Sequence, residues 1–151
     1  MPELLAIRRQ FQRHHRPLEP ARCDVRGLLR APFSNLDAYG KRMGWSFKWV
    51  SSAANDFNRD YHVSFTPEDL ANGEAYYNYT KQKLWGSDMP GASVFYKDPS
   101  GELFHTYSTY GRGLDMLMLN YHYLDLVPKG RNEADLSYPQ AWVRHHDKYD
   151  D

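Results

Sequence analysis

Cysteine is nearly absent from this chain of 151 residues, since only Cys23 is present. No disulfide can therefore form within the chain. Long apolar runs are also missing, and no stretch approaches the roughly 20 apolar residues that a membrane-spanning helix requires. The N-terminus lacks the apolar core of a secretory signal. These absences predict a protein located in the cytoplasm and not in a membrane, and a length of 151 residues fits one domain.

An excess of charge of either sign is missing as well, because 19 basic residues balance 19 acidic ones. Nucleic acids and anionic membranes attract basic surfaces. Neither is therefore expected as a partner. Aromatic residues, by contrast, are abundant at 15% of the chain, and they fill protein cores and contact surfaces.

Residues 1–30 differ in composition from the rest of the chain. They contain seven arginines but no lysine, tyrosine or tryptophan. They show no sustained helical or alternating apolar pattern. A basic arm for nucleic acid is one interpretation of the arginines, but no tyrosine or tryptophan lies between them for stacking. A disordered or poorly packed tail is the interpretation that we favour.

From Ala31 onward the pattern predicts helices and strands. A helix is expected to start at Ser34 or Asn35, either of which can cap it, and to end at Gly44. Residues 45–52 predict a strand whose three aromatic side chains, at positions 45, 47 and 49, lie on one side. A second strand is expected over residues 73–80.

The clearest prediction is an antiparallel hairpin over about residues 93–108, because two β-rich runs flank the turn sequence DPSG. A capped helical turn is expected before it, with Thr66 as the cap and Pro67 as its first residue. After the hairpin, apolar residues at helical spacing predict a helix over residues 113–126. A last short helix is expected over residues 141–149. The fold class is therefore mixed α/β.

Metal binding is considered because the chain has seven histidines. His145 and His146 are adjacent, so on a helix they point about 100° apart and form no chelating pair. His105 and His122 would approach each other if the helix packs on the hairpin. No cysteine partner or tight histidine spacing supports a site. Histidines packed among tyrosines are the favoured interpretation, and no metal or cofactor is predicted.

Other candidate sites are similarly weak. Arg112 lies between Gly111 and Gly113 at a helix start, which suggests an anion site, but the remaining residues of known phosphate loops are missing. Acidic residues at positions 68 and 69 fit a solvated helix N-terminus. Cys23 has no apolar or aromatic shell that would mark a functional thiol. No catalytic residue is predicted.

Four segments carry a resemblance to a known family. They are RAPFSNLDAYGKRMGW, DFNRDYHVSFTPED, SVFYKDPSGELFHTYSTYGRGLDMLMLNYHYLDLVPKGRNE and WVRHHDKYD. From Arg30 onward the chain resembles the domain-of-unknown-function 899 family, thioredoxin-like proteins often described as predicted dithiol-disulfide oxidoreductases. The resemblance implies a thioredoxin-like fold over residues 30–151 and a Cys-Pro-Ser-Cys segment upstream. This chain has no CxxC motif, so the implied fold is an incomplete one without its dithiol unit.

Residues 1–29 are hypothesised to be an out-of-frame translation of that dithiol unit. Back-translated one nucleotide later, MPELL allows Cys-Pro-Ser-Cys, and the codons near Ser34 return to the frame of the family. A frameshift or a sequencing error would produce this pattern. It would also explain the excess of arginine in the segment.

The resemblance implies an oxidoreductase parent, and we expect this chain itself to be catalytically inactive. Pro90 lies loosely where thioredoxins place a cis-proline. His105, Tyr107 and Arg112 are the polar groups to examine near a former active site, and hydrogen bonding within a Tyr-rich core is their alternative role. An aromatic-rich binding or self-associating module, through exposed apolar surface, is the alternative function, and an inert fragment is the third.

Overall fold

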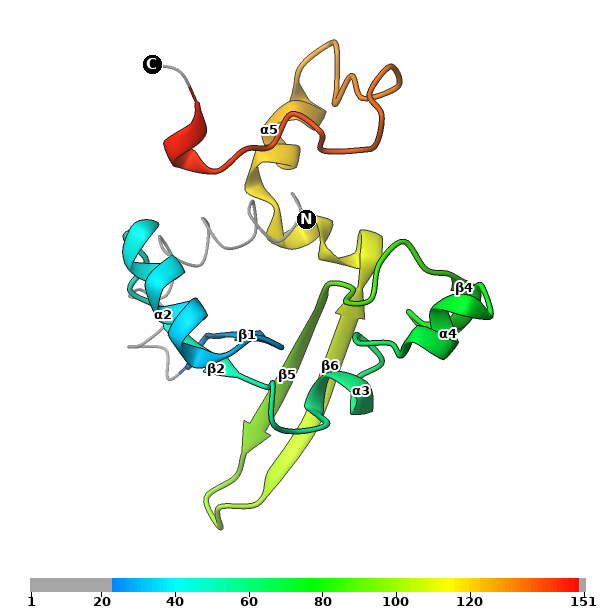
Figure 1. Cartoon of the computed structure of the whole chain (residues 1–151). Coiled ribbons are helices and arrows are strands. Elements are labelled where there is room, and N and C mark those ends of the chain that lie inside the picture. The colour runs from blue at the N-terminus through cyan, green and yellow to red at the C-terminus, as the bar shows by residue number, and fades with distance from the viewer. Residues whose placement is uncertain (1–22, 150–151) are drawn as a thin grey trace. The chain divides into compact units, whose positions relative to one another are not determined.

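The computed structural model describes residues 23–149, which divide into two compact units. The first unit combines residues 23–55 with residues 116–149, and the second comprises residues 56–115. Figure 1 shows the helices and strands in chain order. Both types of element occur, with one parallel and two antiparallel strand pairs. The predicted mixed α/β class is therefore confirmed.

The first unit contains a β-α-β segment made of β1 (Arg26–Leu29), α2 (Phe33–Arg42) and β2 (Lys48–Ser51). The two strands pair in parallel, an arrangement that needs a crossover such as α2 between them. Within the tail predicted over residues 1–29, the backbone of β1 is hydrogen-bonded to β2. The remainder of that prediction, residues 1–22, lies outside the described residues.

Helix α2 begins one residue before its predicted caps. Neither Ser34 nor Asn35 caps it. Instead Pro32 is the N-cap, and its carbonyl accepts the backbone N–H of Asn35 at 3.0 Å. The predicted end at Gly44 is close to the observed end at Arg42, and Gly44 has a φ of +61°, a conformation that glycine adopts without strain.

Three aromatic side chains share one side of the segment that leads into β2, as predicted. Ring centroids lie 5.5 Å apart for Trp45 and Phe47, and 5.0 Å apart for Phe47 and Trp49. The strand itself is shorter than predicted, since it starts only at Lys48. Phe47 is 3% exposed and packs against Gly27 of β1, where an added Cβ would lie 2.8 Å from a carbon of its ring.

Replacing Gly27 with alanine is therefore expected to destabilise the first unit. A Cβ atom has no room beside the buried ring of Phe47, and overpacking of this kind costs about 1–3 kcal/mol. Chemical denaturation followed by tryptophan fluorescence measures the change. Gly86→Ala is the matched control, because a Cβ there meets only ordinary contacts. Equal stability of the two variants would show that β1 does not pack on the aromatic side chains.

The sequence predicts one continuous helix over residues 113–126, but the structure has two helical segments there. A 3-10 helix, η1 (Gly111–Leu117), comes first, and α5 (Leu119–Leu126) follows after a break at Met118, whose φ and ψ are −110° and 82°. A 3-10 helix has poor hydrogen-bond geometry and is therefore short. The chain accordingly leaves this conformation at Met118 and begins a separate α-helix at Leu119. The predicted helix over residues 141–149 is reduced to one 3-10 turn, η2 (His146–Lys148).

The second unit opens with two short helices, α3 (Phe57–Asp60) and α4 (Pro67–Ala71). The cap of α4 is as predicted: the Thr66 hydroxyl accepts the backbone N–H of Asp69, and the carboxylate of Asp69 accepts the backbone N–H of Thr66 in return. Local sequence therefore sufficed to place this helix start.

The predicted strand over residues 73–80 is a tight hairpin instead. It consists of β3 (Glu74–Tyr77) and β4 (Thr80–Lys83). The two turn residues, Asn78 and Tyr79, have φ values of 52° and 63°. Positive φ at both positions is typical of a two-residue hairpin turn, but tyrosine seldom occupies it, which is why the sequence did not reveal the turn.

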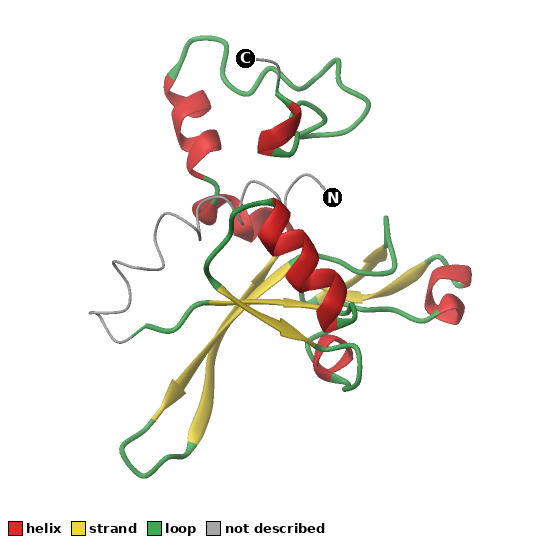
Figure 2. Cartoon of the chain, turned by 60° about the vertical axis from the view of Figure 1, so that its left-hand side comes forward, coloured by secondary structure: helices red, strands yellow, loops and turns green. Residues whose placement is uncertain are grey.

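The predicted hairpin near residues 93–108 is confirmed and is slightly longer, with β5 (Gly91–Lys97) paired antiparallel to β6 (Leu103–Tyr110). In Figure 2 it is the long yellow ribbon that ends in a green turn. The turn is closed by Asp98, whose carbonyl accepts the N–H of Gly101 and whose side chain accepts the N–H of Glu102.

Burial of the hairpin is confined to the end where Gly91 pairs with Tyr110, because only the last three residues of β6 are buried. Tyr110 belongs to a buried cluster with three other residues of the second unit, Phe65, Tyr77 and Met89. The outer face is defined by two cross-strand pairs that share one side, Val94 with Tyr107 and Tyr96 with Phe104. These four side chains are 42–54% exposed. The core of the second unit therefore lies at the Gly91–Tyr110 end of the hairpin, and side chains on both faces are exposed in its other half.

Candidate functional site

Tyr77 joins two segments that the sequence analysis singled out separately. Its side chain is 3% exposed. Its hydroxyl donates to the carbonyl of Pro90 at 2.6 Å and accepts the backbone N–H of Gly111 at 2.9 Å. Pro90 and the start of the GRGLD segment are thereby held together in the second unit. No local pattern marked Tyr77 for this role, because its two partners lie 13 and 34 residues away.

Arg112, the candidate anion ligand, forms an ion pair with Asp115 at 2.7 Å. Local backbone conformation and packing explain why glycine occupies the two positions beside Arg112. Gly111 has a φ of +49°, and a Cβ on Gly113 would lie 2.0 Å from the Thr109 hydroxyl oxygen. The two glycines are therefore explained by the start of η1, which needs a positive φ at Gly111 and close packing at Gly113. An anion at Arg112 would have to compete with the carboxylate of Asp115.

His105 lies in a chain of hydrogen bonds across the hairpin. Its Nε2 atom is 2.7 Å from the Ser108 hydroxyl, which is itself 2.7 Å from the hydroxyl of Ser93. The imidazole meets the ring of Tyr61 edge-on at 5.3 Å. Tyr107 lies on the outer face, and its carbonyl is 3.1 Å from the same Nε2 atom. His105 therefore connects the two strands to Tyr61, the residue that follows α3.

Tyrosine contacts recur at the histidines, as the sequence analysis favoured. His62 meets Tyr76 edge-on at 4.9 Å, and His145 meets Tyr39 at 5.5 Å. The predicted approach of His105 to His122 stays a prediction, because these two residues belong to different units. The side chain of His146 lies outside the described part.

Glu133, which the sequence analysis did not single out, accepts hydrogen bonds from three residues of the first unit. Its carboxylate accepts the hydroxyl of Tyr121 at 2.8 Å, the backbone N–H of Gln140 at 2.9 Å and the indole N–H of Trp142 at 2.7 Å. Arg131 lies over the Tyr121 ring, 3.9 Å from its centroid. Burial, followed by the bond to Glu133, raises the pKa of Tyr121 to about 12. The cluster therefore holds residues 121–142 together.

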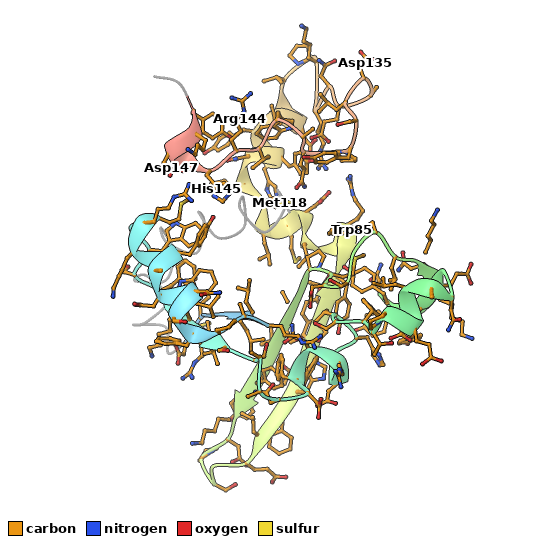
Figure 3. All side chains as sticks on the ribbon, viewed as in Figure 1. Trp85, Met118, Asp135, Arg144, His145 and Asp147 are labelled. Carbon is orange, nitrogen blue, oxygen red and sulfur yellow. The ribbon has the colours of Figure 1, made fainter. Side chains whose placement is uncertain are left out.

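The C-terminal segment lies against α2 within the first unit (Figure 3). The guanidinium of Arg42 donates two hydrogen bonds to one oxygen of Asp147, at 2.7 and 2.9 Å. The hydroxyl of Tyr39 lies 2.5 Å from Nδ1 of His145. Hydrogen bonding by Arg42 holds the pKa of the Asp147 carboxyl below its usual value. One ion pair and one tyrosine-histidine pair thus fix this segment.

Contact between the C-terminal segment and α2 is expected to weaken in acid. Because the pKa of Asp147 is lower in the folded chain than in the unfolded one, its stabilising effect is present at neutral pH. That effect is lost as the pH falls below about 4. Hydrogen exchange of residues 143–149 as a function of pH measures the loss. Asp147→Asn should remove the pH dependence, and a dependence that survives this change contradicts the assignment.

The remaining candidates do not form a site in the described residues. Cys23 is exposed. Among residues 23–149, no group of three histidine, cysteine or acidic side chains is arranged to hold a metal ion. Over the same range, no helix is both long and apolar enough to span a bilayer.

Comparison with known proteins identifies a family. A family model described as a bacterial protein of unknown function (DUF899) matches residues 6–149. The chain belongs to this family. No curated protein and no solved structure matches it. The DUF899 match begins well ahead of Arg30, so it includes most of the segment that composition sets apart.

Proposed function

We propose that this DUF899 chain is a thioredoxin-like protein that does not catalyse thiol-disulfide exchange. One observation carries the proposal: the sequence has a single cysteine. A dithiol enzyme attacks a disulfide with one thiolate and resolves the resulting mixed disulfide with a second thiol. Cys23, which is exposed, has no second thiol in the chain to complete this cycle.

The thioredoxin-like part of the proposal is supported by the order of elements. A parallel β-α-β segment, the pattern that accompanies thioredoxin-like motifs, spans Arg26–Ser51. An antiparallel hairpin and a helix follow further along the chain. The loose correspondence of Pro90 to a cis-proline receives no support, because no peptide bond in residues 23–149 is cis.

A disulfide reductase assay tests the proposal. The purified chain and its Cys23→Ser variant are incubated with dithiothreitol and insulin, and the precipitation of reduced insulin chains is followed. Both proteins should match the rate of dithiothreitol alone, because neither can form an internal disulfide. A rate above that background that persists in Cys23→Ser would indicate a contaminant. A rate that disappears in Cys23→Ser would overturn the proposal.

A second candidate function is self-association through the outer face of the hairpin. The supporting observation is that its four apolar side chains, at positions 94, 96, 104 and 107, are about half exposed. A two-stranded sheet also has unpaired backbone at both edges, which can pair with another chain. A second copy of this chain offers the same face and the same edges.

Sedimentation velocity over a range of concentrations tests this candidate. A defined dimer that Tyr107→Lys abolishes would support it. Tyr123→Lys, which changes a more exposed tyrosine of α5, is the control and should leave the dimer intact. A monomer at all concentrations, or equal effects of the two variants, would contradict it.

The out-of-frame origin of residues 1–29 remains a separate prediction. The DUF899 match from residue 6 and the pairing of β1 weigh against it for the residues that they include. Resequencing the gene across the codons for Met1 to Phe33 decides the matter. An extra or missing base that restores a Cys-Pro-Ser-Cys frame would indicate a sequencing error. An unchanged frame would rule out that error and would mean that the organism makes the chain without the dithiol.

A further inference from the structure

The second unit contains a pocket lined by residues such as Arg59, Asp69 and Tyr76. It has a volume of about 230 Å³ and lies between α3, α4 and β3. Pockets for drug-sized ligands occupy about 300–1,000 Å³, so this one suits a smaller molecule. Its lining combines charges of both signs with apolar side chains. The charges and the apolar side chains of the lining therefore indicate the chemical class of a ligand, whereas the pocket volume limits only its size.

Two side chains that can donate to an anion line the pocket, Arg59 and His62. The side chain of Arg59 is 54% exposed, and its guanidinium lies 3.4 Å from the carboxylate of Asp56. His62 has a φ of +51°. Such backbone conformations are costly for a residue with a side chain and cluster at functional sites. Arginine in particular binds carboxylates with two parallel hydrogen bonds.

A fixed negative charge lines the same pocket. One carboxylate oxygen of Asp69 accepts both the backbone N–H and the hydroxyl of Thr66, each at 2.8 Å. These bonds lower the pKa of Asp69, so its carboxylate is charged at neutral pH. The carboxylate of Asp69 would repel a ligand whose only charged group is a carboxylate, whereas an ammonium group on the ligand would form an ion pair with it.

Part of the pocket lining is apolar, beside the hydroxyl side chains of Ser64 and Thr66. Phe65 is buried and belongs to the core cluster of the second unit, and Ala75 packs against that cluster. The ring of Tyr76 also lines the pocket, where it is held edge-on against His62. An apolar side chain on the ligand would therefore be removed from water here.

We propose that this pocket binds a free α-amino acid with an apolar side chain. Its carboxylate pairs with Arg59 and His62, its ammonium group pairs with Asp69, and its side chain packs on Phe65 and Ala75. A free amino acid is specified because it carries both charges on one carbon atom, whereas each end of a peptide carries one. The proposal is independent of the thiol chemistry discussed above.

Three probes of similar shape test it on the full chain: phenylalanine, 3-phenylpropionate, which lacks the ammonium group, and phenethylamine, which lacks the carboxylate. Binding is followed by shifts of the backbone amide signals of residues 59–76 in two-dimensional NMR. Phenylalanine should bind at least tenfold more tightly than either analogue, because each charged hydrogen bond contributes enough for about a tenfold change or more.

Arg59→Gln is expected to weaken phenylalanine binding at least tenfold. Arg112→Gln is the matched control, since it also removes an arginine paired with an aspartate three residues away, and it should leave binding unchanged. Unchanged spectra of the other core residues show that each variant folds. Absence of shifts with phenylalanine, equal binding of all three probes, or equal effects of the two variants would overturn the proposal.

Discussion

Replacing Tyr77 with alanine is expected to lower the free energy of unfolding of the second unit by about 3–5 kcal/mol, the range for truncating a large buried aromatic side chain. The ring of Tyr77 lies in the core cluster and meets Tyr110 edge-on at 5.6 Å. Its removal leaves a cavity that the short strands β3 and β4 cannot fill by a small shift. The same change also breaks the link between Pro90 and Gly111.

Tyr77→Phe separates these two contributions. It keeps the ring but leaves the Pro90 carbonyl and the Gly111 N–H without the hydroxyl that both of them use. Unsatisfied buried groups cost about 1–3 kcal/mol, so this variant should lie between the wild type and Tyr77→Ala.

Urea denaturation followed by the fluorescence of Trp85, the one tryptophan of the second unit, measures both changes. To isolate that signal, each variant is made in a background in which the other three tryptophans are phenylalanine. Tyr79→Phe is the matched control, because it removes a hydroxyl bond from an exposed side chain and should change stability by less than about 0.5 kcal/mol. Equal losses for Tyr77→Phe and Tyr79→Phe would show that the Tyr77 hydroxyl does not join the two segments.

Replacing Glu133 with glutamine is expected to lower the free energy of unfolding of the first unit by about 2–4 kcal/mol. Three groups donate to the Glu133 carboxylate, from Tyr121, Gln140 and Trp142. A carboxylate only accepts hydrogen bonds, whereas an amide presents an NH₂ group in place of one oxygen. All three donors share one oxygen, Oε1, which the amide oxygen of glutamine can replace. The change removes the negative charge from these bonds and turns the second oxygen, 2.9 Å from the Tyr121 hydroxyl, into a donor. Hydrogen bonds to charged groups contribute about 1.5–3 kcal/mol, against about 0.5–1.5 kcal/mol for neutral ones.

The change should also be visible at Trp142, whose indole N–H signal in NMR is expected to shift when its acceptor is replaced. Glu68→Gln is the control, since it makes the same chemical change at an exposed position of α4 and should lie within about 0.5 kcal/mol of the wild type. A wild-type stability and an unshifted indole signal in Glu133→Gln would contradict the geometry of the cluster.

Predictions from sequence succeeded where a few adjacent residues decide the structure. The DPSG turn, the Thr66 cap and the aromatic side of the segment before β2 all depend on backbone preferences and alternation within a few residues. Those signals were sufficient for the mixed α/β class and for the hairpin. The resemblance of four long segments was sufficient for the family.

The candidate site depended on contacts between distant residues, which no local pattern reports. β1 is a strand because its backbone pairs with β2, about 20 residues further on. Tyr77 and Glu133 acquire their roles from partners that the fold brings to their oxygen atoms. The pocket at Arg59 exists because α3, α4 and β3 meet there. Residue order thus determined where the backbone turns and which side chains can be buried, whereas tertiary packing decided which polar groups meet, because burial and hydrogen bonding depend on both partners' positions.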